Sequence, residues 1–201
     1  MSDKHSHTNE RTFNPDKAAR LDDPARLETL PPAAVLHLLR VAAGMTVADI
    51  GAGTGYFAVP IADTVGAGRV VAVDFQAEML EMFRRKLAAT TVENIELIHG
   101  EARHTHVSAH TCDRVLIANV WHELDAREEV LAEMQRILRP DGMLAIVDWR
   151  ADLEPPPGPP AEHRVSRESV AAELAAAGWS VVGSEPVGTF SYGVLAAPPV
   201  G

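Results

Sequence analysis

The chain has 201 residues, of which 46% are hydrophobic and 23% are charged, so it suits one well-filled domain and excludes wholesale disorder. Its formal net charge of −10 disfavours a nucleic-acid partner, because phosphate backbones are held by clustered Lys and Arg. Cys112 is the single cysteine, which excludes an internal disulfide and a thiolate cluster. No apolar run is long enough to cross a bilayer, and the polar first residues are unlike a signal peptide, so we expect a cytoplasmic protein.

The first part of the chain divides into a tail and a helical lid. Residues 1–11 are polar and are expected to be disordered, and the segment after them has helical spacing interrupted by Pro15 and Pro24. Pro31 and Pro32 suit the first turn of a second helix, which Gly44 is expected to end. We therefore predict residues 1–29 to be a tail and helical lid, and residues 30–201 to be the main domain.

From residue 47 onward, short apolar runs alternate with helix-length amphipathic segments. The expected strands cover residues 47–50, 69–74, 95–100, 113–119 and 143–149. The expected helices cover residues 54–65, 76–89 and 126–138, the last of them closed by the sequence RPDG. Apolar strands separated by helices predict a parallel sheet that is covered on both faces.

The C-terminal part of the chain breaks this alternation. Ser166 is placed to cap a helix that runs to Ala177, and a proline-rich stiff connection, residues 154–160, precedes it. Two further strands, 180–185 and 189–197, are separated by only three residues. That gap permits a hairpin and is too short for a parallel crossover. The prediction is a three-layer α/β sandwich with seven strands, of which the last is antiparallel.

A glycine-rich turn stands between the first strand and the next helix, in the sequence VADIGAGTGYF at residues 47–57. Such a turn lies at the carboxyl end of a parallel strand, where a nucleotide-like ligand can approach bare peptide. The glycines are spaced G-x-G-x-G, and Tyr56 stands where a dinucleotide fingerprint needs its third small residue. No Gly-Lys-Ser or Gly-Lys-Thr follows, so the turn is not a P-loop either. A pyrophosphate cradle is poorly supported.

Several segments in order resemble the motifs of class I S-adenosylmethionine-dependent methyltransferases, in the ubiquinone/menaquinone-biosynthesis-like branch. They are residues 47–55, the strand VVAVD ending at Asp74, GEA at 100–102, and the run ILRPDGMLAIVDW. The resemblance covers roughly residues 30 to 197 and implies a Rossmann-like fold. It also implies S-adenosylmethionine as the cofactor and methyl transfer to a small molecule as the activity.

The resemblance and the residue chemistry together suggest a cofactor site. Asp74 ends a strand, where a carboxylate can accept both ribose hydroxyls, although it is equally placed to cap the next helix. Phe75 and Met79 are candidates for lying against the adenine, and core packing explains Met79 as well. The family places the adenine amino group near Glu101, where Asp is usual, and near the amide of Ala102. The remaining expected cofactor-binding residues are Asp49, Gly51, Gly53, Gly55, Tyr56 and Asn119.

The acceptor side carries no fixed catalytic residue, because a general base is needed only when the acceptor holds a proton at neutral pH. His122 follows the fourth expected strand and is the best candidate for the base; a histidine that only starts a helix is the alternative. Further candidates for lining the acceptor site are Asp148, Trp149, Arg150, His163 and Arg164, together with Trp121, which packing would also explain. Candidates for covering the site are Phe13, Tyr56 and Tyr192, and core or lid packing explains each of these three equally well.

Four residues in one loop, His104, His106, His110 and Cys112, are of types that bind zinc. Their spacing matches no established structural zinc pattern, so we expect an exposed loop and no metal.

The sequence as a whole predicts a methyltransferase, either monomeric or homodimeric. Two alternatives stay open. In an NAD(P)-dependent oxidoreductase Asp74 would also hold a ribose, and a non-catalytic S-adenosylmethionine-binding protein would show the same binding motifs.

Overall fold

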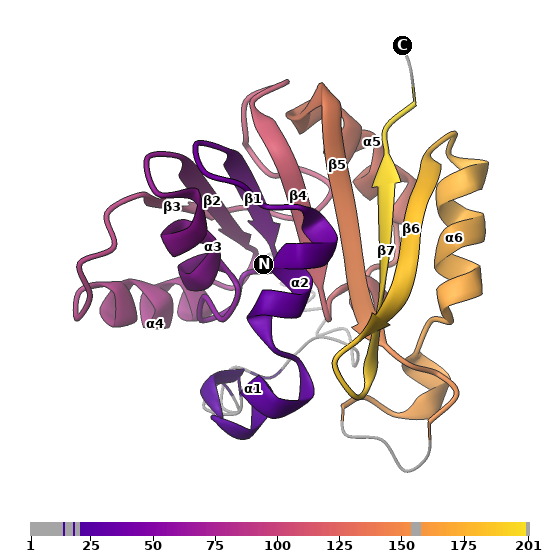
Figure 1. Cartoon of the computed structure of the whole chain (residues 1–201), viewed down its shortest axis with the longest axis horizontal. Helices are drawn as coiled ribbons and strands as arrows, with labels where there is room; N and C mark the ends of the chain where they lie inside the picture. Colours follow the sequence, from indigo (N-terminus) through magenta and orange to yellow (C-terminus); the bar gives the residue numbers. More distant parts are fainter. Residues whose placement is uncertain (1–13, 15–17, 19–20, 154–157, 200–201) are drawn as a thin grey trace, which may run out of the picture.

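Seven strands form one sheet in the order β3-β2-β1-β4-β5-β7-β6. A computed structural model describes residues 14, 18, 21–153 and 158–199 (Figure 1). The predicted disorder of residues 1–11 and part of the proline-rich connection lie outside these residues. The strands are β1 Thr46–Ile50, β2 Arg69–Asp74, β3 Ile95–His99, β4 Cys112–Ala118, β5 Leu138–Trp149, β6 Ser180–Val187 and β7 Ser191–Ala197.

The direction of the strands confirms the predicted topology. Strands β1 to β5 are parallel, whereas β7 runs antiparallel to both of its neighbours, β5 and β6. The hairpin turn before β7 has the expected three residues but lies two positions later, because Pro186 and Val187 still pair with β7 and residues 188–190 form the turn. The helices are α1 Ala25–Thr29, α2 Pro32–Leu39, α3 Ala58–Val65, α4 Ala77–Leu87, α5 Arg127–Ile137 and α6 Arg167–Ala176.

Three predicted helix boundaries are wrong. Helix α2 ends at Leu39, well before Gly44, because Arg40 adopts the left-handed conformation (φ 54°). Helix α3 begins at Ala58, not at residue 54, since the glycine turn occupies the residues before it. The sequence RPDG does not close α5; it belongs to β5, which starts directly after the helix, where Leu138 pairs with Cys112 across a register shift.

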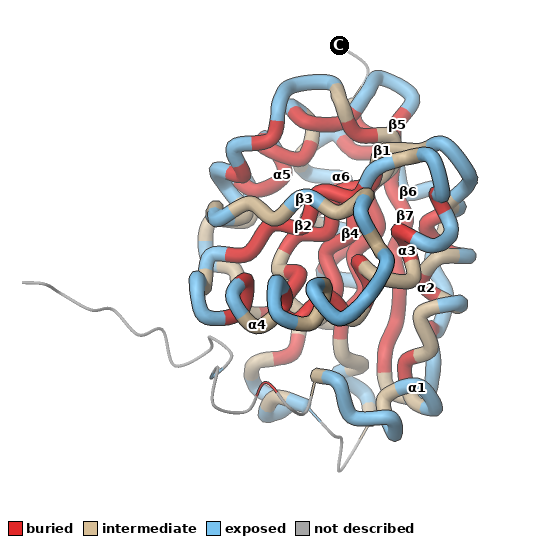
Figure 2. Tube along the Cα trace, turned by 90° about the vertical axis from the view of Figure 1, so that its left-hand side faces the viewer, coloured by how far each residue is buried: buried red, intermediate tan, exposed pale blue. Residues whose placement is uncertain are grey.

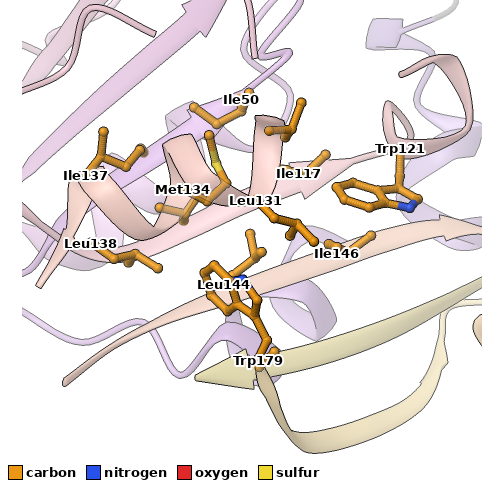
Figure 3. Packing of buried hydrophobic residues seen from close by; sticks show 14 of the residues in the cluster. Ile50, Ile117, Trp121, Leu131, Met134, Ile137, Leu138, Leu144, Ile146 and Trp179 are labelled. Carbon is orange, nitrogen blue, oxygen red and sulfur yellow. The ribbon is translucent and has the colours of Figure 1, made fainter. Parts of the chain in front are cut away.

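The hydrophobic core has one cluster on each face of the sheet. Helices α5 and α6 cover one face, where Trp121 and Trp179 pack with the aliphatic side chains of α5 and the central strands (Figure 3). Helices α2 and α3 cover the other face together with Phe83 of α4. Figure 2 shows this layering, with buried strands inside and exposed helix surfaces outside. This arrangement is the predicted three-layer sandwich.

Residues 21–30 lie beyond the carboxyl ends of the parallel strands, where Figure 1 shows α1 below the sheet. Three contacts hold this segment, which we call the lid segment. Tyr56 Oη donates to the Leu30 carbonyl at 2.9 Å, the Thr189 N–H donates to the Thr29 carbonyl at 2.8 Å, and Lys86 forms an ion pair with Asp22. Among the described residues, no helix is both long enough and apolar enough to span a membrane.

Candidate active site

A cavity of about 1330 Å³ opens at the carboxyl edge of the parallel strands, beneath the lid segment. Pockets for one small ligand usually enclose roughly 300–1,000 Å³, so this cavity has room for a cofactor and a second molecule. Most of the predicted site residues line it, namely Gly51, Gly53, Tyr56, Asp74, Phe75, Met79, Glu101, Ala102, Asn119 and His122. Asp49 and Gly55 do not line it.

Neighbouring side chains of the protein leave no room for a side chain at two of the three glycines in the turn. All three glycines have positive φ, which L side chains rarely adopt. A Cβ on Gly55 would lie 2.1 Å from the Phe83 ring, and one on Gly51 would lie 2.5 Å from Val120. Gly53 is different, because its N–H donates to Asp74 Oδ2 at 2.8 Å and its Cα faces the cavity under Leu21. Gly55 therefore serves packing, whereas the main chain at Gly53 borders the cavity.

Asp74 ends β2 and is 94% buried, with its two carboxylate oxygens on two different backbone groups. Oδ2 accepts from the Gly53 N–H and Oδ1 from the Gln76 N–H at 2.9 Å, so the side chain ties the turn to the start of α4. Burial raises the pKa of Asp74 above its usual value, and the two N–H groups oppose that rise. Each oxygen keeps one further lone-pair direction for a ligand hydroxyl. Capping and ligand binding are thus compatible in one side chain.

Three buried polar atoms around the turn have no hydrogen-bond partner within the described part of the chain. They are Asp49 Oδ2, Thr54 Oγ1 and Asn119 Oδ1. Burial, followed by the charge of Asp74, raises the pKa of Asp49 to about 7. Unpaired buried polar atoms are costly, so these three atoms are candidates for contacts with a polar ligand. Sequence reasoning missed Thr54, although its position between two glycines was an available signal.

The residues expected near the adenine lie along one wall of the cavity. Phe75 is 49% exposed and Met79 is buried beside it on α4. Ala102 packs against the core, and Glu101 is an exposed lining residue whose Oε2 accepts from Arg103 Nε at 2.8 Å. An exposed aromatic ring at a cavity is a suitable platform for a planar base.

His122 and Asp148 form a buried pair at the other end of the cavity. His122 lies in the short helix η2 (Trp121–Glu123), which follows β4. Its Nδ1 lies 2.8 Å from Oδ1 of Asp148, near the end of β5. Asp148 also accepts from the backbone N–H groups of His122 and Trp149. Burial lowers the pKa of His122, but Asp148 and Glu123 raise it more, so it lies above that of an ordinary histidine. Because the carboxylate fixes a proton on Nδ1, Nε2 is the basic nitrogen of the neutral ring.

The other acceptor-side candidates divide into two groups. Trp149 and His163 line the cavity, as does Tyr56. Trp121 is fully buried and donates to Glu173, Tyr192 donates to the Val165 carbonyl, and Arg164 donates to the Pro159 carbonyl. Asp148 does not line the cavity, but it contacts His122 and the backbone N–H of Trp149, two residues that do. Arg150 is bound to Asp152 outside it, and Phe13 lies outside the described residues.

The histidine loop is held by contacts within the protein. The rings of His104 and His106 meet edge to face, His110 Nδ1 lies 3.0 Å from the Leu138 carbonyl, and Cys112 is buried. Over residues 14, 18, 21–153 and 158–199, no three His, Cys, Asp or Glu side chains are grouped closely enough to hold a metal.

Comparison with known proteins agrees with this geometry. Residues 47–142 match the family model described as a methyltransferase domain. A methyltransferase from Aquifex aeolicus, described as S-adenosylmethionine-dependent, shares 34% identity and a TM-score of 0.88, and the match covers 93% of this chain and all of that one. The chain belongs to the class I S-adenosylmethionine-dependent methyltransferases.

Curated relatives carry the same family signature. The demethylmenaquinone methyltransferases of Listeria monocytogenes and Staphylococcus epidermidis are 34% and 30% identical over 114 and 115 residues. These matches cover 56% and 57% of this methyltransferase chain, which spans only 48% and 47% of the relatives' length. The chain therefore spans about half the length of these curated relatives.

Proposed function

We propose that this chain transfers the methyl group of S-adenosylmethionine to a small-molecule acceptor and releases S-adenosylhomocysteine. One observation carries the proposal: a single cavity joins the glycine turn and Asp74 to the His122–Asp148 pair. Its size suits a cofactor and an acceptor bound side by side. The names of the Listeria and Staphylococcus relatives make demethylmenaquinone the first acceptor to test.

The described residues suit each part of the cofactor. Asp74 would accept the two ribose hydroxyls, and Phe75 and Met79 would lie against the adenine, near the Ala102 amide. The amino-acid end would rest on the turn at Gly51 and Gly53, with its ammonium group toward Asp49 and the Asn119 carbonyl. Glu101 would reach the adenine amino group by exchanging its exposed contact with Arg103 for it.

Methyl transfer from the bound sulfonium is an in-line displacement, for which the chain chiefly positions the acceptor and excludes water. When the acceptor is a hydroxyl or another protonated group, His122 would accept its proton at Nε2. Asp148 would hold the ring and stabilise the imidazolium that forms. This pair is the reason we assign the base to His122.

Calorimetric titration with S-adenosylhomocysteine and with NAD tests the cofactor. We expect binding of S-adenosylhomocysteine and none of NAD; a preference for NAD would favour an oxidoreductase. Methyl-release assays with quinols, phenols, amines and thiols then test turnover. A single acceptor that turns over establishes the enzyme, whereas tight cofactor binding with no acceptor would favour a non-catalytic binding protein.

The remaining assignments are also proposals. We infer that residues 21–29 belong to a lid region distinct from the domain that starts at residue 30, supported by the contacts of residues 21–30 over the cavity. Most of the predicted tail before residue 21 lies outside the described residues. The cytoplasmic location, the lack of a nucleic-acid partner or a metal, and a monomeric or homodimeric state stay predictions from the sequence.

A further inference from the structure

Arg26 is the basic residue that the lid helix α1 carries into the cavity wall. It is partly buried, and its guanidinium lies over the Tyr56 ring, with the guanidinium carbon 4.1 Å from the ring centroid. Tyr56 is itself fixed, because its hydroxyl donates to the Leu30 carbonyl. The lid therefore places one cation at a defined position beside the glycine turn.

The hydrogen-bonding capacity of Arg26 is largely unused. A guanidinium has five N–H donors, and within the described part of the chain one of them reaches an acceptor, the Leu21 carbonyl at 3.0 Å from Nη1. Burial lowers the pKa of Arg26, which means that its charge is incompletely solvated. A partly buried cation with unused donors is a site for an anion, and a planar fork suits a carboxylate.

A buried acid lies across the turn from this cation. Asp49 and Arg26 influence each other electrostatically, yet they form no ion pair within 4.0 Å in the described residues, and Asp49 Oδ2 has no partner there. Two opposite charges held apart beside bare main chain match a zwitterion, whose ammonium and carboxylate groups are joined by a single carbon. The amino-acid end of S-adenosylmethionine is such a group.

We propose that Arg26 binds the carboxylate of the cofactor's amino-acid end, so that the lid helix α1 recognises the complete zwitterion. This inference rests on the proposed function. Its consequence is selectivity: the protein distinguishes S-adenosylmethionine from adenosyl sulfonium compounds that lack the carboxylate. Tyr56 contributes by holding the guanidinium over its ring, a contact that uses none of the N–H donors of Arg26.

A four-way binding comparison tests the proposal. The dissociation constants of S-adenosylmethionine and its decarboxylated analogue are measured by calorimetry for the wild type and for Arg26→Gln. We expect the wild type to prefer the carboxylate-bearing ligand by roughly 10–100-fold, the range for a charge-assisted hydrogen bond, and Arg26→Gln to reduce this preference to about threefold or less. The affinity for the decarboxylated analogue is expected to stay unchanged in the variant.

Two further variants serve as controls for the effect of Arg26→Gln. Arg26→Lys keeps the charge without the fork and is expected to restore part of the preference. Arg85→Gln removes an exposed arginine of α4 that pairs with Glu81, and it is expected to bind both ligands as the wild type does.

The outcomes separate this inference from the proposed function. An equal loss of affinity for both ligands in Arg26→Gln would mean that Arg26 only supports the lid. Unchanged binding with a raised KM for the acceptor would assign Arg26 to the acceptor. Either result overturns the inference, whereas a wild type that binds neither ligand overturns the proposed function itself.

Discussion

Each of the two ends of the cavity has a buried aspartate that accepts from two backbone N–H groups, but the two aspartates differ in their further contacts. At the cofactor end, Asp74 terminates β2 and holds two backbone N–H groups. At the acceptor end, Asp148 lies near the end of β5, also holds two backbone N–H groups, and in addition binds the ring of His122. Asp74 lines the cavity, and Asp148 does not. One buried carboxylate borders the cavity, and the other contacts a histidine that borders it.

The largest effect is expected at the acceptor end. His122→Ala should lower kcat by about 10²–10⁴-fold, the usual contribution of a general base, while the dissociation constant for S-adenosylhomocysteine stays unchanged. Steady-state kinetics and calorimetry measure the two quantities. His37→Ala, on the exposed surface of α2, is the control. A His122→Ala enzyme with normal kcat would show that the pair is structural.

The cofactor end should respond in the opposite way. Asp74→Asn is expected to raise the dissociation constant for S-adenosylhomocysteine by about 10–100-fold, because it removes charge-assisted bonds to the ribose hydroxyls. Calorimetry measures this change, with exposed Asp63→Asn on α3 as the matched control. If the constant did not change, Asp74 would only tie the glycine turn to α4, and the contrast between the two ends would disappear.

The pH profile sharpens the role of Asp148. Since His122 must be neutral to accept a proton, kcat/KM should rise with pH and level off above the pKa of His122, which Asp148 and Glu123 hold above the ordinary histidine value. Asp148→Asn removes the nearer charge, so the midpoint should move to lower pH and the plateau should fall. A midpoint that moved upward, or stayed in place, would contradict the coupling of the two side chains.

The smallest effect concerns a single proton at the cofactor end. With a pKa of about 7, Asp49 is mostly protonated at pH 6, and an ammonium group beside it would favour the charged form. Binding of S-adenosylhomocysteine at pH 6 should therefore release close to one proton. Calorimetry in two buffers of different ionisation enthalpy detects it. Asp49→Asn should abolish the release; a release that persisted would place the ammonium elsewhere.

Local sequence patterns predicted most of the fold because each depends on neighbours in the chain. Apolar runs, helix-length spacers and one short hairpin defined seven strands and the antiparallel direction of β7. Helix ends were less accurate, since Arg40 ends α2 early in a left-handed conformation and Leu138 pairs with Cys112 in the sheet. The glycine spacing located the turn correctly, but it did not reveal that Phe83 is what excludes a side chain at Gly55.

The sequence by itself determined the order of motifs, the turn after β1 and the acid at the end of β2, because these follow from residues adjacent in the chain. Only the tertiary structure decided that His122 meets Asp148, that Arg26 lies beside the turn, and that Glu101 faces Arg103. Such contacts join elements that are distant in sequence or depend on side-chain rotation, and periodicity and spacing contain no information on either.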